Sequence, residues 1–571
     1  MFLHFSSEIR LLPGIASKTA FVLLLAASIP NLISAQPCSC NHTITNQQLA
    51  VNANSLNILP GDTICIQAGT RDYLYLINFH GDSLHYLVFI NCGGAVIVQN
   101  NFNPFGIKIA NSSFFRFTGS GVNSIKYGIR VLGTTVNSNG VSLDEKSTNF
   151  EVDHLEVANT GFAGIMSKTD PVCDLSSNRG FFTQYHTVFH DNYIHNNGGE
   201  GFYIGHSSYN GFLTNCNGQP DTLYPHEIKG LRVYNNIVEN SHLDGIQIGC
   251  ATEDCEIYGN TVTGYGASAI AAQNSGIQLG GGTTGKCYNN FLSGGTGTAI
   301  MVFGTGNNII FNNIIYNIGL TFFPDDPTKR VHGIFVDDRT TIPGRYFNLV
   351  NNTIVNVKTD GIRFSSLLSA NNKINNNLII HPGSLGSYSV PALSYIYLSS
   401  GVNVVQSNNY TNPFMTNVHF RDTLAGNFRL RADSPARDMG TDVSLMGINF
   451  DFDNLFRPYT SLFDIGGYEY HPENLWTGAI SSSWDVAGNW SKADIPFPDD
   501  DVVVSSGTPH PLHLASTGKV CHYLVVCTGA ILTLESSAEI TITGNLTIQQ
   551  GGSIDNHGIV TIKGNLINQN L

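Results

Sequence analysis

Charged residues are scarce in this chain and make up 12% of its 571 residues. Few charges, together with 59 Gly residues and much Asn, Ser and Thr, indicate short strands joined by many turns rather than helices. Lys and Arg are the scarcer charged types, and a chain of net charge −14 lacks the basic surface that nucleic-acid binding requires. We therefore expect an all-β protein with no nucleic-acid partner.

Long apolar runs are absent, with one exception near the N-terminus. Residues 20–29 are apolar, Arg10 and Lys18 precede them, and residues 33–35 form a cleavage site of the secretory type. The run is too short to cross a membrane comfortably. We expect residues 1–35 to be a signal peptide, and the mature chain to be secreted or at the cell surface without a transmembrane segment.

Cys-x-x-Cys motifs are absent too. The eleven cysteines all follow the expected signal peptide, so export permits disulfides, although spacing alone does not determine their pairing. Because eleven is an odd number, at least one thiol is free or intermolecular.

A repeat is plain between residues 111 and 381. Where nothing is inserted, Asn recurs after 24 residues (Asn236 to Asn260) and after 23 residues (Asn290 to Asn313). A fixed period in the twenties with β-type residues is typical of a β-solenoid. We expect these Asn side chains to stack as an internal ladder between coils. Its expected members are Asn192, Asn236, Asn260, Asn290, Asn313, Asn352 and Asn377.

The start of the repeat region carries a further motif. Residues 60–64 read Pro-Gly-Asp-Thr-Ile, and residues 68–70 read Ala-Gly-Thr. This resembles the entry end of a right-handed parallel β-helix of the pectate-lyase-like superfamily. The resemblance implies that residues 36–470 form such a helix.

We expect the Asn pairs of the repeat, such as Asn235-Asn236, to end before residue 382, and residues 382–470 to form a closing segment. Its motifs run from Ser434 to Gly440 and from Asp464 to Glu469. They resemble the C-terminal end of many secreted bacterial β-helix proteins. The acidic residues here are of the type that binds calcium, the one cofactor that the sequence suggests. We interpret them instead as turn and cap residues.

The last hundred residues differ from the rest. They hold all three Trp residues and then alternating strands such as 532–534 and 540–542, with Gly and Asn between them. We expect residues 474–571 to form a smaller β-solenoid module, which breaks off in mid-pattern. The module resembles those of bacterial surface adhesins.

Chemistry is expected at one variable position of the repeat, eight residues after each Asn where nothing is inserted. It lies just before an inward strand, such as Ile246 and Ile248 with Gln247 pointing outward. Ser268 and Ser275 compete for this position in one coil, and Ser275 is preferred because the residues after it repeat those after Asp244. The resulting polar column is Glu200, Asp244, Ser275, Thr298, His332 and Asp360.

A second stripe follows three residues further on. Aromatic and amide side chains in this stripe suit sugar rings, which offer apolar faces and hydroxyl edges. Insertions at 206–229, 319–331 and 337–346 fall beside it, and long loops gathered around one strand are often functional. The stripe consists of Tyr203, Gln247, Gln278, Met301, Phe335 and Arg363.

The column offers candidate catalytic residues. Glu200 and Asp244 on adjacent coils would lie roughly 5 Å apart, the separation used by retaining glycosidases. His332 beside Asp360 would be an oriented general base, with Tyr203 as the alternative base of a lyase, and Arg363 would balance a substrate carboxylate. The alternative is that acidic residues before Gly merely bond the turn backbone.

The strand motifs also resemble those of alginate epimerases and related lyases on this fold. There the residue before the Gly-Ile of such a strand contributes to the active site, which would implicate Asp244 and His332. Those epimerases carry Asp-Pro-His where this chain has residues 203–206, Tyr-Ile-Gly-His. The calcium ligands and catalytic Arg of pectate lyases are not identifiable, so the fold does not define the reaction.

We therefore expect a secreted β-helix that binds an extended polysaccharide along the groove from Glu200 to Asp360. A carbohydrate-active enzyme, either a lyase or epimerase or a glycosidase, is the first hypothesis. The alternative is a non-catalytic cell-surface adhesin or structural protein.

Overall fold

The computed structural model describes residues 39–100, 102–326, 328–383 and 394–570, and the expected signal peptide lies outside them. Strands dominate, which confirms the all-β prediction. The short 3-10 helices in the described ranges are η1 (Ala53–Ser55), η2 (Met415–Val418), η3 (Ser444–Met446) and η4 (Ala487–Asn489). A search of these ranges finds no helix with the length and apolarity needed to cross a membrane.

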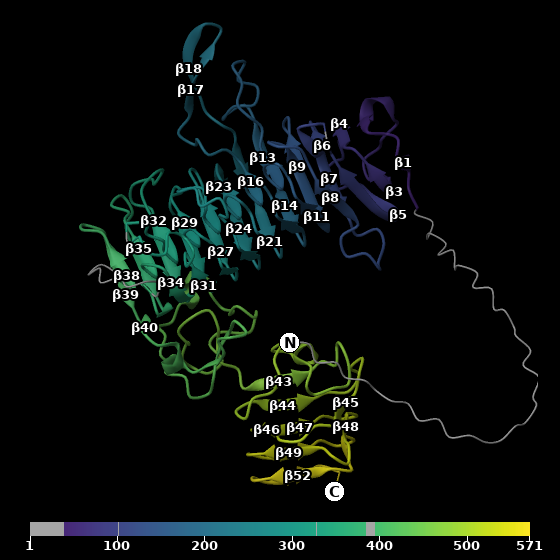
Figure 1. Cartoon of the computed structure of the whole chain (residues 1–571), viewed down its shortest axis with the longest axis vertical. Coiled ribbons are helices and arrows are strands. Elements are labelled where there is room, and N and C mark those ends of the chain that lie inside the picture. The colour runs from purple at the N-terminus through teal and green to yellow at the C-terminus, as the bar shows by residue number, and fades with distance from the viewer. Residues whose placement is uncertain (1–38, 101, 327, 384–393, 571) are drawn as a thin grey trace, which may run out of the picture. The chain divides into compact units, whose positions relative to one another are not determined.

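One parallel sheet of twelve strands forms a face of the solenoid (Figure 1). Its strands are β2 (Ala50–Asn52), β4 (Leu74–Ile77), β6 (Phe105–Ala110), β9 (Asn139–Asp144), β12 (Ile165–Ser167), β16 (Phe202–Ile204), β22 (Ile246–Ile248), β26 (Ile277–Leu279), β29 (Ile300–Val302), β32 (Ile334–Val336), β35 (Ile362–Phe364) and β38 (Ile396–Leu398).

A sheet of 23 strands forms the other two faces, joined where β3 and β5 run across both. Its strands are β1 (His42–Ile44), β3 (Thr63–Arg71), β5 (Leu87–Gln99), β7 (Ser113–Thr118), β8 (Ile129–Gly133), β10 (Thr148–Asp153), β11 (Leu155–Ala158), β14 (Thr187–His190), β15 (Tyr193–His195), β20 (Arg232–Tyr234), β21 (Ile237–Glu239), β24 (Cys255–Tyr258), β25 (Thr261–Thr263), β27 (Gly285–Tyr288), β28 (Phe291–Ser293), β30 (Asn308–Phe311), β31 (Ile314–Ile318), β33 (Phe347–Val350), β34 (Thr353–Val357), β36 (Asn372–Asn375), β37 (Leu378–Ile380), β39 (Val404–Ser407) and β40 (Tyr410–Asn412).

Each coil buries the alternate residues of its strands. Ile246 and Ile248 are fully buried, as predicted, and they stack on Ile277 and Leu279 of the next coil. Repetition of this contact builds one continuous apolar core along the solenoid. Removing this apolar surface from water is the main stabilising contribution.

The predicted Asn ladder is confirmed. The side-chain amide of Asn260 donates to the Asn290 carbonyl oxygen at 2.9 Å, and that oxygen also accepts the Asn260 backbone N–H at 3.1 Å. The same pair of bonds recurs from Asn192 onward. We expected the Asn pairs to end before residue 382, which was wrong, because Asn377 continues the ladder to Asn409 at 3.0 Å.

The first Asn of each pair has a separate role. These residues adopt the left-handed backbone conformation, which Asn tolerates better than most side chains. From Asn289 onward, their side-chain amides donate to backbone carbonyls of the closing segment. Examples are Asn312 to Phe450 at 2.7 Å and Asn351 to Asp464 at 3.0 Å. The closing segment therefore runs alongside the coils and is bonded to them one by one.

Small sheets complete the β-helix. A parallel one consists of β13 (Thr183–Tyr185), β19 (Glu227–Lys229) and β23 (Ala251–Glu253), and antiparallel pairs are formed by β17 (Phe212–Cys216) with β18 (Gln219–Leu223) and by β41 (Phe420–Asp422) with β42 (Asn427–Leu430).

Residues 473–568 form their own stack of parallel sheets around a core that includes the three Trp side chains. The sheets are β43 (Glu473–Trp476), β44 (Asp501–Val504), β47 (Leu524–Val526), β50 (Leu546–Ile548) and β53 (Leu566–Asn568); β45 (Leu512–Leu514), β48 (Ile531–Leu534) and β51 (Ser553–Asn556); and β46 (Lys519–Cys521), β49 (Glu539–Ile542) and β52 (Ile559–Ile562).

Candidate functional site

Strand register brings the predicted column and stripe together. Phe202, Ile246 and Ile277 are direct partners in the twelve-stranded sheet, and the same register continues through Ile300, Ile334 and Ile362. The six column residues each lie two positions before these partners, and the six stripe residues one position after. The preference for Ser275 over Ser268 is confirmed by this register.

Column and stripe lie side by side on the outer face. Ser275 Oγ is 3.9 Å from Met301 Sδ, and the rings of His332 and Phe335 are 5.6 Å apart. The column is nevertheless covered, because Asp244 is 0% and Glu200 4% exposed. We expected a polar column open to a groove, and the structure covers it instead.

Glu200 and Asp244 are buried carboxyl groups with incomplete hydrogen bonding. Asp244 Oδ1 accepts the Ser275 N–H at 2.5 Å, whereas Asp244 Oδ2 and Glu200 Oε2 have no partner among the described residues. Burial raises the pKa of Asp244 to about 7; the Ser275 N–H opposes this shift and the Glu200 charge adds to it. Burial also raises the pKa of Glu200. Asp244 can therefore hold a proton near neutral pH.

His332 and Asp360 form the expected pair. His332 Nδ1 lies 3.1 Å from Asp360 Oδ2, which also accepts from Arg330 Nη2 at 2.7 Å, and Asp360 Oδ1 accepts the Ser394 N–H at 3.0 Å. Burial lowers the pKa of His332, with the Asp360 carboxylate opposing. Burial would raise the pKa of Asp360, but the bonds from His332 and Arg330 hold it below its usual value. A neutral imidazole whose Nδ1–H faces a carboxylate leaves Nε2 free to accept a proton.

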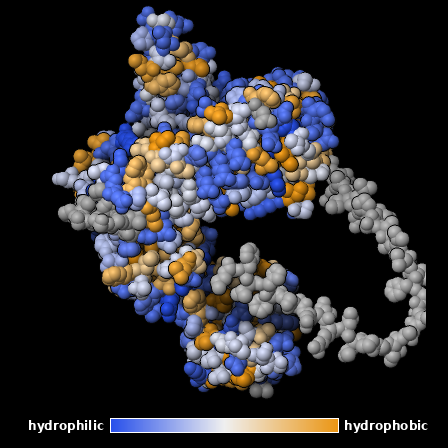
Figure 2. All heavy atoms as spheres, in the orientation of Figure 1, coloured by the Kyte–Doolittle hydropathy of each residue, from blue (hydrophilic) through white to orange (hydrophobic). Residues whose placement is uncertain are grey.

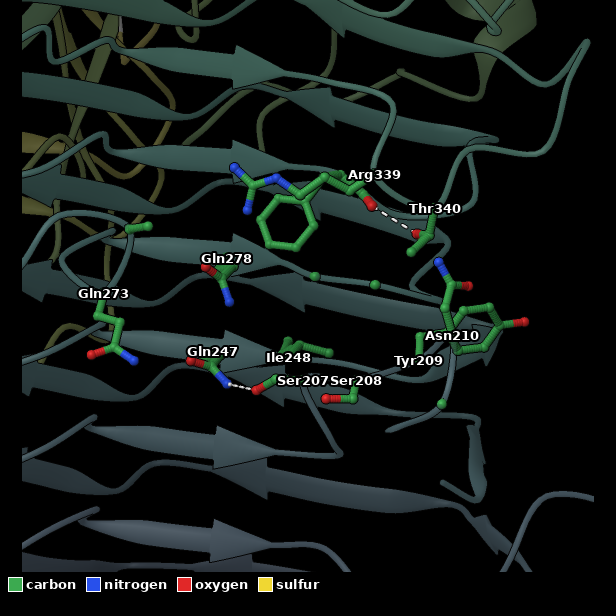
Figure 3. Close-up of a pocket in the computed structure, with 15 residues that line it drawn as sticks. Ser207, Ser208, Tyr209, Asn210, Gln247, Ile248, Gln273, Gln278, Arg339 and Thr340 are labelled. Atoms are coloured by element: carbon green, nitrogen blue, oxygen red, sulfur yellow. Dashed lines mark hydrogen bonds between the residues drawn. The ribbon is translucent and has the colours of Figure 1, made fainter. Parts of the chain in front are cut away.

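A pocket of about 410 Å³ lies over the stripe at Gln247 and Gln278 (Figure 3). Gln247 Nε2 donates to Ser207 Oγ at 3.0 Å, and the guanidinium of Arg339 lies 4.1 Å from the ring centre of Phe303. The lining comes from the outer face of β22 and β26 and from three loops: 207–211, 272–273 and 339–340. Two of these loops belong to insertions predicted to wall a groove.

The four candidate catalytic residues do not line this pocket. Of the stripe residues, Gln247 and Gln278 line it, and Tyr203, Phe335 and Arg363, the other candidate binding residues, do not. Tyr203 lies beside it, with its hydroxyl 2.9 Å from Ser207 Oγ. Lys168 Nζ lies 5.2 Å from the ring centre of Tyr203.

The stripe continues past the pocket with an aromatic and cationic character. Arg363 pairs in register with Phe335 on one side and Tyr397 on the other, and its guanidinium carbon lies 5.8 and 4.9 Å from their ring centres. Among the described residues, Arg363 has no carboxylate within ion-pair distance. Such a guanidinium is available to an anionic ligand.

Sequence reasoning missed Lys168, Ser207 and Arg339. Each lies in a loop after a strand, where no repeat register indicates which side chain turns toward the sheet. The insertions at 206–229 and 337–346 were the only signal for Ser207 and Arg339, and no insertion was recognised around Lys168. The loop at 272–273 was missed as a wall for the same reason.

The acidic residues of the closing segment are bonded within the chain. Asp451 accepts the backbone N–H groups of Asp453, Leu455 and Glu469, and Asp453 pairs with both branches of Arg429. These are the contacts expected of turn and cap residues.

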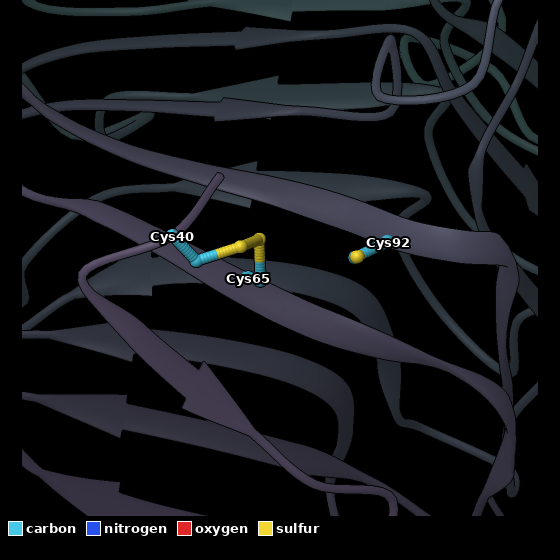
Figure 4. A group of neighbouring side chains, drawn as sticks. All are labelled: Cys40, Cys65 and Cys92. Carbon is cyan, nitrogen blue, oxygen red and sulfur yellow. A yellow bond between two sulfur atoms is a disulfide. The ribbon is translucent and has the colours of Figure 1, made fainter. Parts of the chain in front are cut away.

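Cysteines also pair in ways that spacing did not reveal. Disulfides join Cys40 to Cys65, which Figure 4 shows with Cys92 beside it, and Cys173 to Cys216. Cys92 is disulfide-bonded as well. Among the cysteines that the structure describes, Cys250, Cys255, Cys287, Cys521 and Cys527 are free.

The family described as right handed beta helix region matches residues 225–420, and a domain of unknown function (DUF8693) matches residues 475–570. With the parallel registers above, the chain is a right-handed parallel β-helix protein followed by a smaller β-solenoid. No curated protein matches the chain.

Several solved structures are similar. Pectate lyase Pel9A is 14% identical, with 76% of this chain and 97% of that one covered and a TM-score of 0.40. The PL6 family alginate lyase AlyGC is 15% identical, with 92% and 76% covered and a TM-score of 0.37. The GH136 lacto-N-biosidase from Eubacterium ramulus is 10% identical, with 63% and 64% covered and a TM-score of 0.39.

Proposed function

We propose that this chain binds an extended polysaccharide along the outer face of the twelve-stranded sheet. The observation that carries the proposal is the pocket in which Gln247 and Gln278 present equivalent amides from adjacent coils, beside Arg339 on Phe303. Amides and hydroxyls pair with sugar hydroxyls, and aromatic faces suit apolar ring faces. A repeating ligand would meet the same amide on these two adjacent coils.

An enzyme of the lyase or epimerase class is the form of this function that the geometry favours. His332 would serve as a general base oriented by Asp360, and Arg363 would pair with a uronate carboxylate. A glycosidase would instead use Glu200 and Asp244, which are buried to the same degree as His332 and Asp360. In a lyase, the Glu200 and Asp244 carboxyl groups would instead hold protons beside the groove.

Secretion belongs to the same proposal. The expected signal peptide and the bridges Cys40–Cys65 and Cys173–Cys216 suit an oxidising compartment outside the cytoplasm. Extracellular polysaccharides would be the accessible polymers there.

Incubation of the purified chain with polygalacturonate, alginate, xylan and β-glucan tests the proposal. New ultraviolet absorbance from unsaturated uronate ends indicates a lyase, new reducing ends alone indicate a glycosidase, and binding without product favours an adhesin. A wild-type chain that neither binds nor converts any of the four polymers contradicts the proposal.

The double variant Gln247→Ala/Gln278→Ala tests the pocket itself. Loss of two hydrogen bonds of about 1 kcal/mol each should weaken polymer binding roughly thirtyfold. Gln406→Ala, the same change at an exposed position on the 23-stranded sheet, is the matched control. Equal affinity in the double variant and the control would exclude this pocket as the binding site.

The catalytic assignment has its own test. If a product is detected, His332→Ala should abolish it while binding persists. Glu200→Gln and Asp244→Asn should leave a lyase active and inactivate a glycosidase. Full activity in all three variants would exclude these residues as the catalytic group.

A further inference from the structure

Two loops that are distant in sequence form one lobe beside the candidate site. We define the lobe as residues 168–182 and 205–226. Its projecting part is the hairpin of β17 and β18, which Figure 1 shows extending away from the sheets and which carries an apolar patch in Figure 2. The disulfide Cys173–Cys216 joins the two loops across 43 positions.

Arg179 provides a second tie across the lobe. Its guanidinium carbon lies 4.0 Å from the ring centre of Tyr209 and 5.6 Å from that of Tyr224. Arg179 Nη2 donates to the Tyr209 carbonyl at 2.6 Å, and the Arg179 backbone N–H donates to the Tyr224 carbonyl at 2.9 Å. One side chain from the first loop thus holds both ends of the second.

A third tie lies at the base. The Thr169 N–H donates to His226 Nε2 at 3.1 Å, and burial lowers the pKa of His226 to about 4. His226 therefore stays neutral and keeps accepting this bond above that pH. The base of the lobe is fixed without either the disulfide or Arg179.

The lobe walls two pockets. The pocket over Gln247 and Gln278 uses lobe residues 207–211. A second pocket of about 360 Å³ uses lobe residues 168–170 and 176–177 together with the turn at 144–146.

Strand order places β16 between these two pockets. Met166 of β12 lines the second pocket, Gln247 of β22 lines the first, and Tyr203 of β16 is the register partner of both. Tyr203 is bonded to Ser207 of the lobe, with Lys168 over its ring. The lobe is therefore a partition that meets the floor of the groove at Tyr203.

We propose that Arg179 and the Cys173–Cys216 disulfide are positioning residues that hold this partition, so that the groove offers one polysaccharide two subsites on either side of Tyr203. The ligand in this inference rests on the proposed function; the immobility of the lobe does not. A wall already ordered in the free protein avoids the cost of ordering it on binding. A chain that reaches both pockets contacts both faces of the partition and gains from its order at each, whereas a shorter one gains at one face only.

Hydrogen exchange on the full chain without ligand tests the immobility. Cys173→Ser/Cys216→Ser and Arg179→Ala should each speed exchange about tenfold in peptides from 172–180 and 207–216. Exchange in β22 and β26 should stay unchanged. Arg179→Lys keeps the charge but loses the planar stacking, so it should resemble Arg179→Ala. Arg232→Ala, which removes an exposed pair with Asp254, is the matched control.

Lobe peptides that exchange at the wild-type rate in all three variants would overturn the inference. Faster exchange throughout the coils in both Arg179→Ala and Arg179→Lys would also overturn the inference. Arg179 would then stabilise the whole β-helix and not the lobe in particular.

Binding to polygalacturonate and to its oligomers of increasing length tests the two subsites. The wild-type Kd should fall with length until one oligomer reaches both pockets and then level off. In the variants the Kd for polymer should rise roughly tenfold, while that for the shortest bound oligomer, which contacts one face of the partition, should rise only about threefold. An equal loss at every length would overturn the two-subsite inference. If the wild type binds no probe, the proposed function fails, and the exchange measurement alone decides on the lobe.

Discussion

Asp244 is held with one carboxylate oxygen bonded to the Ser275 N–H and the other without a partner among the described residues. Burial with an unbonded oxygen costs more free energy for an ionised carboxylate than for a neutral carboxylic acid. The same burial makes Asp244 a sensitive probe of its surroundings. Asn at this position could still accept the Ser275 N–H.

Asp244→Asn should change how stability depends on pH. The folded pKa of about 7 lies above the usual value of 3.8, so the folded state holds a proton that the unfolded state loses. The free energy of unfolding therefore falls as pH rises from about 4 to about 7, by at most about 4 kcal/mol from this group. Urea unfolding at pH 5 and at pH 8 should show that the free energy of unfolding falls less between these pH values in the variant than in the wild type. Asp555→Asn, at an exposed position, is the control and should behave like the wild type. The same fall in the free energy of unfolding in the wild type and both variants would contradict the prediction.

At the scale of elements, loop 319–331 depends on one buried ammonium group. Lys358 is fully buried, and its Nζ donates to the carbonyls of Phe322 at 2.7 Å, Phe323 at 2.8 Å and Asp326 at 3.1 Å. Burial lowers the pKa of Lys358. Three carbonyls around one cation hold the loop that carries Arg330.

Lys358→Met should release this loop. The apolar side chain cannot donate to the three carbonyls, so the loop should open more often while the coils persist. Limited trypsin digestion after Lys329 and Arg330 should become about tenfold faster. Lys373→Met, at an exposed position of β36, is the control and should leave the digestion rate unchanged. An unchanged rate in Lys358→Met would contradict the prediction, because other contacts would then hold the loop.

For the whole molecule, a solenoid makes mostly nearest-neighbour contacts, so its stability is distributed coil by coil. The end coils have neighbours on one side only and need other support. Disulfides at Cys40–Cys65 and at Cys92 hold the N-terminal coils, and the closing segment bonded to the Asn pairs holds the later ones.

Reduction should therefore loosen the N-terminal end, in addition to the lobe that Cys173–Cys216 holds. With a phosphine reductant, amide exchange should speed up in β1, β3 and β5, while β22 to β29 should exchange as before. Non-reducing conditions with the same buffer are the control. An equal increase along the whole stack would mean that the coils unfold as one cooperative unit.

The fold could be predicted to a large extent because its signal repeats. Asn236 and Asn260 recur at the coil period, and each fills the same position relative to strands that alternate inward and outward side chains. Register then places Glu200, Asp244 and His332 without further information. The extension of the ladder to Asn409 was missed because an insertion precedes it and hides the period.

The candidate site could be predicted only in part. Gln247 and Gln278 are on strands and follow the period, so they were found. Ser207, Arg339 and Arg179 are in insertions of irregular length, where neighbouring residues carry no period. Their positions depend on contacts with loops more than twenty residues away.

The sequence by itself determined the coil: which residues face inward, which Asn residues stack and which polar positions share a column. These are consequences of local alternation and of a repeat that places identical residues one coil apart. Only the tertiary structure decided that Asp244 is covered, that Arg179 joins two loops and that Tyr203 lies under a partition. Those outcomes depend on how non-repeating loops pack over the sheet, and such packing follows from shape and pairing between distant segments.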